Sequence, residues 1–140
     1  MNYISRCYKN YANFNGRATR AEFWLFYLFV NVFGLLLGLL GFAAALSFGY
    51  VGVHDNNPGA FLLIFVCGIP WLIFTIVNII PLFAVGSRRL HDAGFSGWLL
   101  LLLFIPLVNF IILIMWIVES QHGGNQYGPD PFDRPPLPKY

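Results

Sequence analysis

The chain has 140 residues, of which 58% are hydrophobic and 10% charged. Soluble globular domains average roughly 45–50% apolar and about 25% charged residues, so this composition argues against one. The formal net charge is only +2, and the basic residues lie beside apolar segments, which excludes an extended nucleic-acid-binding surface. We also expect no enzyme, no cofactor and no metal site, because apolar segments leave no room for a separate catalytic domain at this length.

The ionisable residues avoid three long stretches. Residues 23–53, 60–87 and 95–118 contain no Asp, Glu, Lys, Arg or His, and these stretches are 31, 28 and 24 residues long. A membrane-spanning helix needs about 20 apolar residues. The sequence therefore predicts an all-α, polytopic membrane protein with a transmembrane domain over 17–122 and three transmembrane helices at about 23–48, 60–86 and 96–118.

Residues 1–16 are predicted to form an amphipathic N-terminal segment, since apolar and aromatic residues recur there at helical spacing opposite Arg6 and Lys9. Such a helix lies either on the membrane surface or against the ends of the spans, and the pattern does not choose between these. After it, Thr19 and Glu22 have the spacing of a capping box, in which the Thr hydroxyl accepts from a backbone N–H and the Glu carboxylate reaches back. The first span should begin there.

A stripe of small residues in the first span indicates close helix packing. Its members recur every three or four residues: Gly34, Gly38, Gly41 and Ala45. Small residues let helix backbones approach closely where lipid supplies no hydrophobic driving force. We expect packing within one chain, with a homo-oligomer or a membrane-protein partner as the alternative.

The third span is predicted to begin after Ser96, a residue suited to capping a helix. Trp98 and Trp116 are 18 residues apart, which is about 27 Å along an α-helix and close to the spacing of the two interfacial aromatic belts. After this span, residues 123–140 are rich in Gly and Pro, so we expect a flexible C-terminal tail.

Basic residues near the spans predict the orientation. Four lie in residues 1–22, which we call the leader (Arg6, Lys9, Arg17 and Arg20). Two precede the third span (Arg88 and Arg89), whereas the connection at 54–59 has none. By the positive-inside rule, the N-terminus is cytoplasmic. Three crossings would then place the C-terminus on the opposite, outer side of the membrane.

This orientation gathers one polar cluster at the cytoplasmic boundary: Arg17, Arg20, Glu22, Arg88, Arg89, His91 and Asp92. Guanidinium groups bind phosphate, so the cluster is a candidate site for anionic phospholipid headgroups or for a partner. The structural alternative is that these residues fix the topology and pair with one another. His91 and Asp92 alone do not indicate catalysis, since neighbouring side chains on a helix point in different directions and no nucleophile or metal-ligand spacing accompanies them.

These features predict a membrane-embedded binding or assembly component. The alternative is a subunit of an oligomeric small-solute transporter or channel. Transporters normally carry ionisable groups inside the bilayer, and the three apolar stretches have none.

Several motifs together resemble a known family. They are FNGRATRAEFW at 14–24, RLHD at 89–92, SGW at 96–98, Pro106 and GNQYGPDP at 124–131. In this order they are similar to the YhaH-type family of bacterial inner-membrane proteins (DUF805), over nearly the whole chain. The resemblance implies a small multi-span protein of the bacterial inner (plasma) membrane. In that membrane, the orientation expected above places the C-terminus on the periplasmic or extracellular side. That family has no established function, so the resemblance assigns no catalytic residues.

Overall fold

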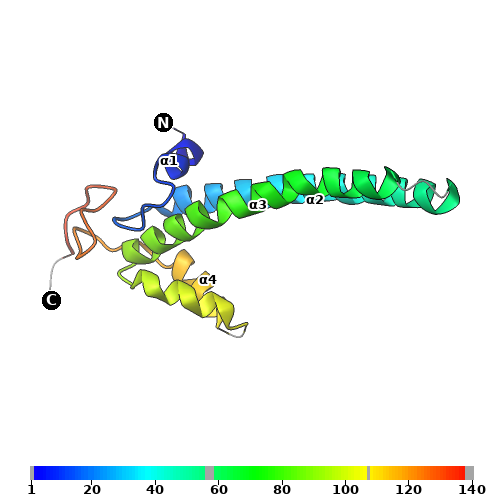
Figure 1. The fold of residues 1–140 in the computed structure, drawn as a ribbon. Coiled ribbons are helices and arrows are strands. Elements are labelled where there is room, and N and C mark those ends of the chain that lie inside the picture. The colour runs from blue at the N-terminus through cyan, green and yellow to red at the C-terminus, as the bar shows by residue number, and fades with distance from the viewer. Residues whose placement is uncertain (1, 56–58, 107, 138–140) are drawn as a thin grey trace. The chain divides into compact units, whose positions relative to one another are not determined.

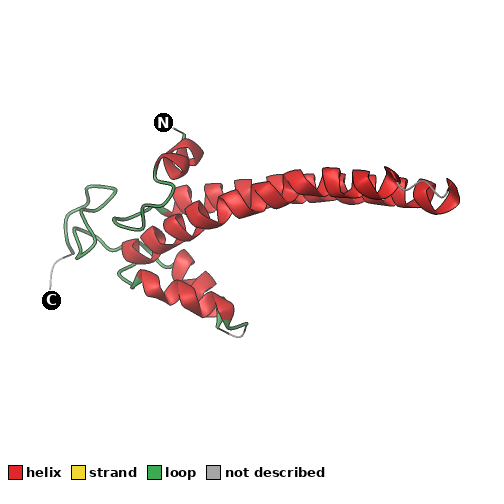
Figure 2. Ribbon diagram, in the orientation of Figure 1, coloured by secondary structure: helices red, strands yellow, loops and turns green. Residues whose placement is uncertain are grey.

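The computed structural model describes residues 2–55, 59–106 and 108–137, and this part of the chain is helical with no β-strand (Figures 1 and 2). In chain order the helices are α1 (Tyr3–Lys9), α2 (Arg20–Asp55), α3 (Gly59–Asp92), the 3₁₀ helix η1 (Gly97–Phe104) and α4 (Asn109–Ile117). The chain forms two compact units, Met1–Tyr27 with Ile80–Tyr140, and Leu28–Ile79. The all-helical prediction is confirmed for the described residues.

The beginning of α2 follows from its capping residue. Thr19 Oγ1 accepts from the backbone N–H of Glu22 at 3.1 Å, as the capping box predicts. The Glu22 carboxylate does not complete the box, because its Oε1 accepts from Arg88 instead, at 2.9 Å. A buried charge pair replaces the second half of the motif.

In the second unit, α2 and α3 run side by side in opposite directions (Figure 1). A Cβ on Gly34 would lie 3.6 Å from the Phe74 ring, and one on Gly38 would lie 3.2 Å from Trp71 Nε1. These two glycines therefore let α3 aromatic side chains approach the α2 backbone. By the same register, Gly41 and Ala45 would face a stretch of α3 whose side chains lie outside the described residues.

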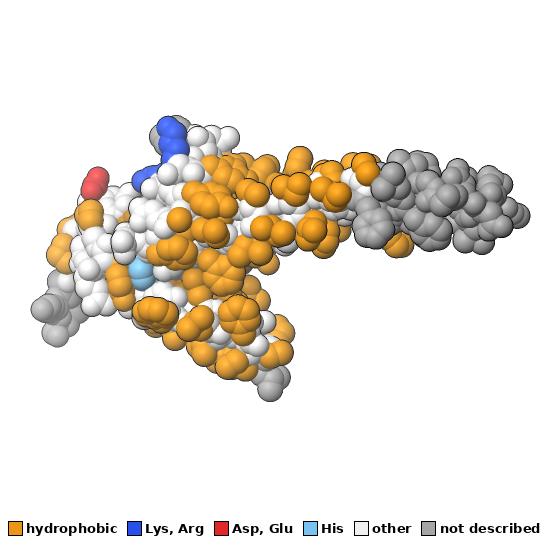
Figure 3. Space-filling view, in the orientation of Figure 1, with side chains coloured by type: hydrophobic (Ala, Val, Ile, Leu, Met, Phe, Trp, Pro, Cys, Tyr) orange, Lys and Arg blue, Asp and Glu red, His pale blue; other side chains and the backbone are white. Residues whose placement is uncertain are grey.

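Within the described residues, two helical segments are long and apolar enough to cross a membrane: Arg20–Ser47 and Gly68–Asp92. Apolar side chains recur along the described surface of these helices, with white backbone and other atoms between them (Figure 3). Leu35, Leu40 and Phe42, for example, are 62%, 68% and 62% exposed. An apolar surface of this kind is unfavourable in water and fits a hydrocarbon environment.

The end of α3 differs from the prediction. The predicted second span ends at about residue 86, but α3 continues to Asp92. Gly94 ends it, with a φ of +85°, and the N–H groups of Gly94 and Phe95 donate to the carbonyls of His91 (3.0 Å) and Leu90 (2.8 Å). These two bonds form a Schellman motif, which favours glycine at this position. Arg88, Arg89, His91 and Asp92 consequently lie on a helix rather than in a loop.

The structure does not confirm the predicted third transmembrane helix at 96–118, because the described residues of this stretch form two shorter helices. Ser96 does cap a helix, since its Oγ accepts from Trp98 N at 3.4 Å, but that helix is η1 and it ends at Phe104. The chain then reverses, and α4 returns beside η1 (Figure 1). Leu100 of η1 and Trp116 of α4 both contact the position of Gly86 on α3. We call η1 and α4 with their connection the helical hairpin. Pro106 at the reversal has no N–H to continue a helix.

The hairpin brings the following chain back to the N-terminal leader. Val118 O accepts from Arg20 Nε at 3.2 Å, and Gly123 O accepts from Arg17 NH1 at 2.7 Å. The structure therefore does not confirm three crossings, which would separate residues 118–123 from the leader by the thickness of the membrane. The described part of the tail, to residue 137, belongs to the first unit, where a Cβ at Gly123 would lie 3.1 Å from Pro136.

Candidate functional site

Asp92 is the centre of a buried group of charged side chains in the first unit. Its Oδ1 accepts from Arg17 Nε at 2.9 Å and its Oδ2 from Arg89 NH1 at 2.8 Å. Ser120 donates a further hydrogen bond to Oδ2. The side chains of Arg17, Arg89 and Asp92 are at most 1% exposed. We call Arg17, Arg89, Asp92 and Ser120 the Asp92 cluster.

Backbone carbonyls complete the bonding of both arginines. Arg17 donates to Gln121 O (2.6 Å) and Gly123 O (2.7 Å), and Arg89 donates to Trp116 O (3.1 Å) and Val118 O. Trp116 and Val118 lie at the carboxyl end of α4, where the helix dipole and its unpaired carbonyls favour a cation. The Asp92 cluster therefore joins the leader, α3 and the chain after α4.

A second buried carboxylate, Glu22, lies near the start of α2. It pairs with Arg88 NH1 at 2.9 Å and approaches Arg6 Nε at 3.8 Å. The Cys7 thiol lies 3.9 Å from Glu22 Oε1. Burial, followed by the nearby Glu22 charge, raises the pKa of Cys7 to about 12. A thiol of this kind is protonated at neutral pH and is a poor nucleophile.

His91 belongs to neither carboxylate pair. Its Nδ1 lies 3.2 Å from Gly16 O, and a carbonyl only accepts, so Nδ1 carries the proton in this contact. The ring stacks on Tyr127 with centroids 3.8 Å apart and planes 4° apart. His91 and Asp92 do not form the acid–base pair that adjacent positions suggest, because they face different neighbours.

The structure thus brings the seven predicted site residues into one unit but leaves few of them accessible. Glu22, Arg88, Arg89, His91 and Asp92 are buried, and the Arg17 side chain is enclosed. Arg20 is exposed. The alternative stated from the sequence, that these residues pair with one another, describes most of the group.

Three tail residues contribute contacts that the sequence reasoning missed. Asn125 donates to His91 O at 2.8 Å, and Tyr127 covers the His91 ring. Asp130 accepts from Gly123 N (3.2 Å), Phe132 N (2.9 Å) and Arg134 Nε (3.0 Å). Burial of the Asp130 carboxyl raises its pKa, but these hydrogen bonds and the Arg134 charge outweigh burial and lower it to about 2. All three residues lie in the motif GNQYGPDP at 124–131. This motif could have indicated the contacts, but its Gly and Pro content favours a flexible tail.

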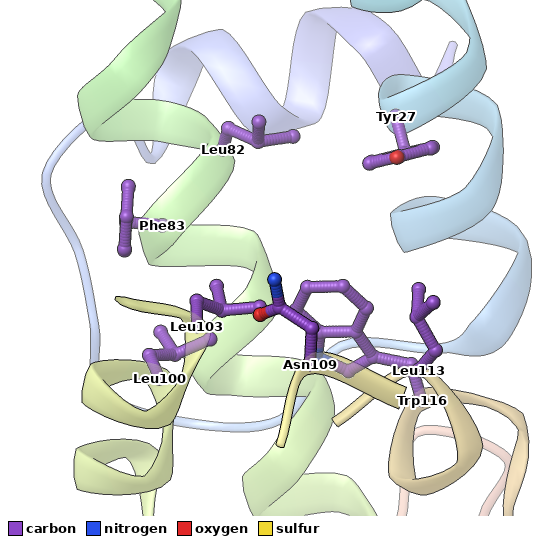
Figure 4. Close-up of a pocket in the computed structure, with 8 residues that line it drawn as sticks. All are labelled: Tyr27, Leu82, Phe83, Leu100, Leu103, Asn109, Leu113 and Trp116. Carbon is purple, nitrogen blue, oxygen red and sulfur yellow. The ribbon is translucent and has the colours of Figure 1, made fainter. Parts of the chain in front are cut away.

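An apolar cavity of about 280 Å³ lies between the helical hairpin and the membrane helices of the first unit. Asn109 lies in its wall beside Trp116 (Figure 4). The Asn109 Oδ1 atom is buried and has no hydrogen-bond partner in the described part of the chain. The remaining wall is apolar or aromatic: Tyr27, Leu82, Phe83, Leu100, Leu103 and Leu113.

Comparison with known proteins gives the family. Residues 11–129 match the model for "Protein of unknown function (DUF805)". This chain belongs to the DUF805 family. It is 35% identical over 132 residues to inner membrane protein YhaH of Escherichia coli (strain K12), covering 94% of this chain and 97% of YhaH. It is 29% identical over 124 residues to inner membrane protein YhaI of the same strain, covering 88% and 89%. No solved structure matches the chain.

Membership agrees with the two apolar helices, since both relatives are named as inner membrane proteins. The resemblance noted from the sequence is confirmed. The DUF805 match also extends from the leader through the hairpin to Pro129. It therefore includes Arg17, Glu22, Arg89 and Asp92 and the first tail contacts.

Proposed function

We propose that this DUF805 protein is a membrane-embedded binding or assembly component that contacts anionic phospholipid headgroups through three exposed basic residues, Arg6, Lys9 and Arg20. A cation contributes about 1 kcal/mol of attraction near an anionic leaflet, provided that it reaches the surface. The observation that supports these three is the burial of the other candidate arginines, whose donors are directed into the protein.

Arg20 has the most suitable position for a headgroup contact. It lies at the start of the candidate span Arg20–Ser47. Its Nε donates to Val118 O at 3.2 Å, which holds the side chain, and the structure describes no hydrogen bond to its two terminal nitrogens. Those nitrogens remain available for the paired oxygens of a phosphate.

Helix α1 presents the other two basic residues of the proposed headgroup contact, Arg6 and Lys9. Cys7 is buried, and Tyr8 packs edge-on against Phe26 with ring centroids 5.4 Å apart. Arg6 and Lys9 lie in the last turn of the helix, and the Arg6 side chain is 55% exposed. The helix is thereby held against α2 with its basic residues outward.

The proposal includes a topology of two crossings, α2 and α3, with the helical hairpin entering and leaving on one side. Eight residues of η1 and nine of α4 correspond to about 16 Å and about 14 Å, or roughly half of a ~30 Å hydrocarbon core each. The positive-inside rule makes the side of the leader cytoplasmic.

Lipid retention tests this function. The protein is purified from bilayers of mixed phosphatidylglycerol and phosphatidylcholine, and the bound lipids are counted by native mass spectrometry. Arg20→Gln should lower the preference for phosphatidylglycerol about fivefold, which corresponds to about 1 kcal/mol. Arg134→Gln is the control of equal charge, because that guanidinium already pairs with Asp130. Equal lipid preference in wild type and Arg20→Gln would contradict the proposal.

A further inference from the structure

A second cavity, of about 650 Å³, lies beside the end of α3 in the first unit. Its floor includes Ser87 and His91, which are one helical turn apart on α3 and only 4% and 9% exposed. Its outer wall includes Phe14, Trp98 and Leu101, which are 43%, 80% and 58% exposed. The cavity therefore has two polar side chains at its buried end and a mainly apolar mouth, to which the exposed Asn15 and Ser96 also contribute.

The two floor groups converge on one place. A Cβ at Gly97 would overlap the Ser87 hydroxyl and would lie 3.0 Å from His91 Nε2. Since His91 Nδ1 is directed to Gly16 O, Nε2 is the acceptor of the neutral ring. The structure describes no hydrogen bond to Ser87 Oγ or to His91 Nε2. Stacking on Tyr127 fixes the ring plane.

We propose that this cavity binds a neutral glycerolipid, a mono- or diacylglycerol, with its glycerol hydroxyls on Ser87 and His91. A hydroxyl both donates and accepts, which matches the Nε2 acceptor and the Ser87 hydroxyl. The described lining contains no Lys, Arg, Asp or Glu, so a charged phosphate at the floor would have no counter-ion and would pay the cost of burial.

The apolar mouth accounts for the acyl chain. Trp98 and Leu101 are exposed residues of η1, and η1 belongs to the hairpin that our proposed topology inserts partway into the bilayer. A chain leaving the cavity between them would continue into the bilayer. The volume lies within the usual range of about 300–1,000 Å³ for small-molecule sites.

The site goes beyond the proposed contact with anionic headgroups and uses different residues. Binding of mono-oleoylglycerol to the full chain is measured by native mass spectrometry, in a detergent without hydroxyl groups such as lauryldimethylamine oxide. Wild type should bind one molecule, and methyl oleate, which lacks the hydroxyls, should bind more weakly. Ser87→Ala should weaken mono-oleoylglycerol binding roughly three- to tenfold, the effect of one hydrogen bond.

Ser47→Ala is the matched control, because that hydroxyl bonds to Ala43 O on α2 at 2.9 Å and does not line the cavity. Arg20→Gln should also leave this binding unchanged, which separates the site from the headgroup contact. Trp98→Ala should weaken mono-oleoylglycerol and methyl oleate equally. Equal binding of the two lipids to wild type would overturn the proposal even if Ser87→Ala failed to fold. Preference for phosphatidylglycerol, or unchanged affinity in folded Ser87→Ala, would overturn it as well.

Discussion

Asp92 is the residue at which the leader, α3 and the chain after α4 meet. Two guanidinium groups and the Ser120 hydroxyl bond to its carboxylate, and all of its charge is removed from solvent. A buried ion pair adds little net stability when it is intact, because desolvation offsets the attraction. Removal of one partner is costly, because it leaves the other charge buried and uncompensated.

Asp92→Asn should therefore lower the free energy of unfolding by about 3–5 kcal/mol, since Arg17 and Arg89 would remain buried without a counter-charge. Thermal unfolding in detergent measures the effect. Asp133→Asn is the matched control, because Asp133 is exposed, and its effect should be within about 0.5 kcal/mol. An equal melting temperature for the two variants would show that Asp92 does not hold these segments together.

Cys7 gives a second prediction at this scale. Because its pKa is raised to about 12, the thiolate form is suppressed at pH 8, and the folded protein should react with iodoacetamide at least about tenfold more slowly than the same chain unfolded in detergent. The thiol of the unfolded chain has the lower, ordinary pKa of a cysteine. The difference in rate should therefore be present at a pH below that pKa, and it should shrink only as the pH rises toward 12. The Cys67→Ala background restricts the reaction to Cys7, because the chain has only these two cysteines. Equal rates in the two states would contradict burial of the thiol.

At the scale of elements, the helical hairpin depends on a close approach at Gly86. A Cβ there would lie 3.3 Å from the Trp116 ring and 3.5 Å from Leu100, and Trp116 Nε1 donates to Gly86 O at 3.3 Å. Trp116 also packs on Phe23 with ring centroids 4.5 Å apart. Both helices of the hairpin, η1 and α4, therefore pack against α3 at Gly86.

Gly86→Leu should separate the hairpin from α3 and destabilise the protein by about 1–3 kcal/mol, the usual cost of overpacking. Gly68→Leu is the matched control on the same helix, because a Cβ at Gly68 would meet no atom within 4 Å. The melting temperature and the fluorescence of Trp116 report the change. A Gly86→Leu protein that melts with the control would argue against docking of the hairpin at this position.

The elements also show how far the sequence predicts the structure. Thr19 fixed the start of α2 correctly, since a side-chain cap is a local interaction. The stretch 95–118 was misjudged, because a mean apolar character does not distinguish one span from two half-length arms. Pro106 and Asn109 near its middle were the only local signals of a reversal. The partners of Asp92 include Ser120, 28 residues away, and such pairings depend on tertiary structure that periodicity does not report.

At the scale of the whole molecule, hydrogen bonds from Arg17, Arg20 and Arg89 to residues 116–123 are incompatible with a membrane between these segments. Arg17 and Arg89 are buried, so breaking their hydrogen bonds to these carbonyls would leave buried donors without partners and would cost stability. The positive-inside rule favours a cytoplasmic N-terminus, and these contacts favour the same side for the tail.

We therefore predict that the N- and C-termini are both cytoplasmic. A compartment-sensitive reporter, such as an enzyme that is active only outside the cytoplasm, should be inactive when fused after the tail and active when inserted between α2 and α3. Single cysteines placed at the exposed positions at each end of the hairpin, Ser96 and Val118, in a chain without Cys7 and Cys67, should react with a membrane-impermeant reagent only in inverted vesicles. An active C-terminal fusion would restore the third crossing expected from the sequence, and the bonds between the leader and residues 116–123 would then be absent from the membrane-inserted protein.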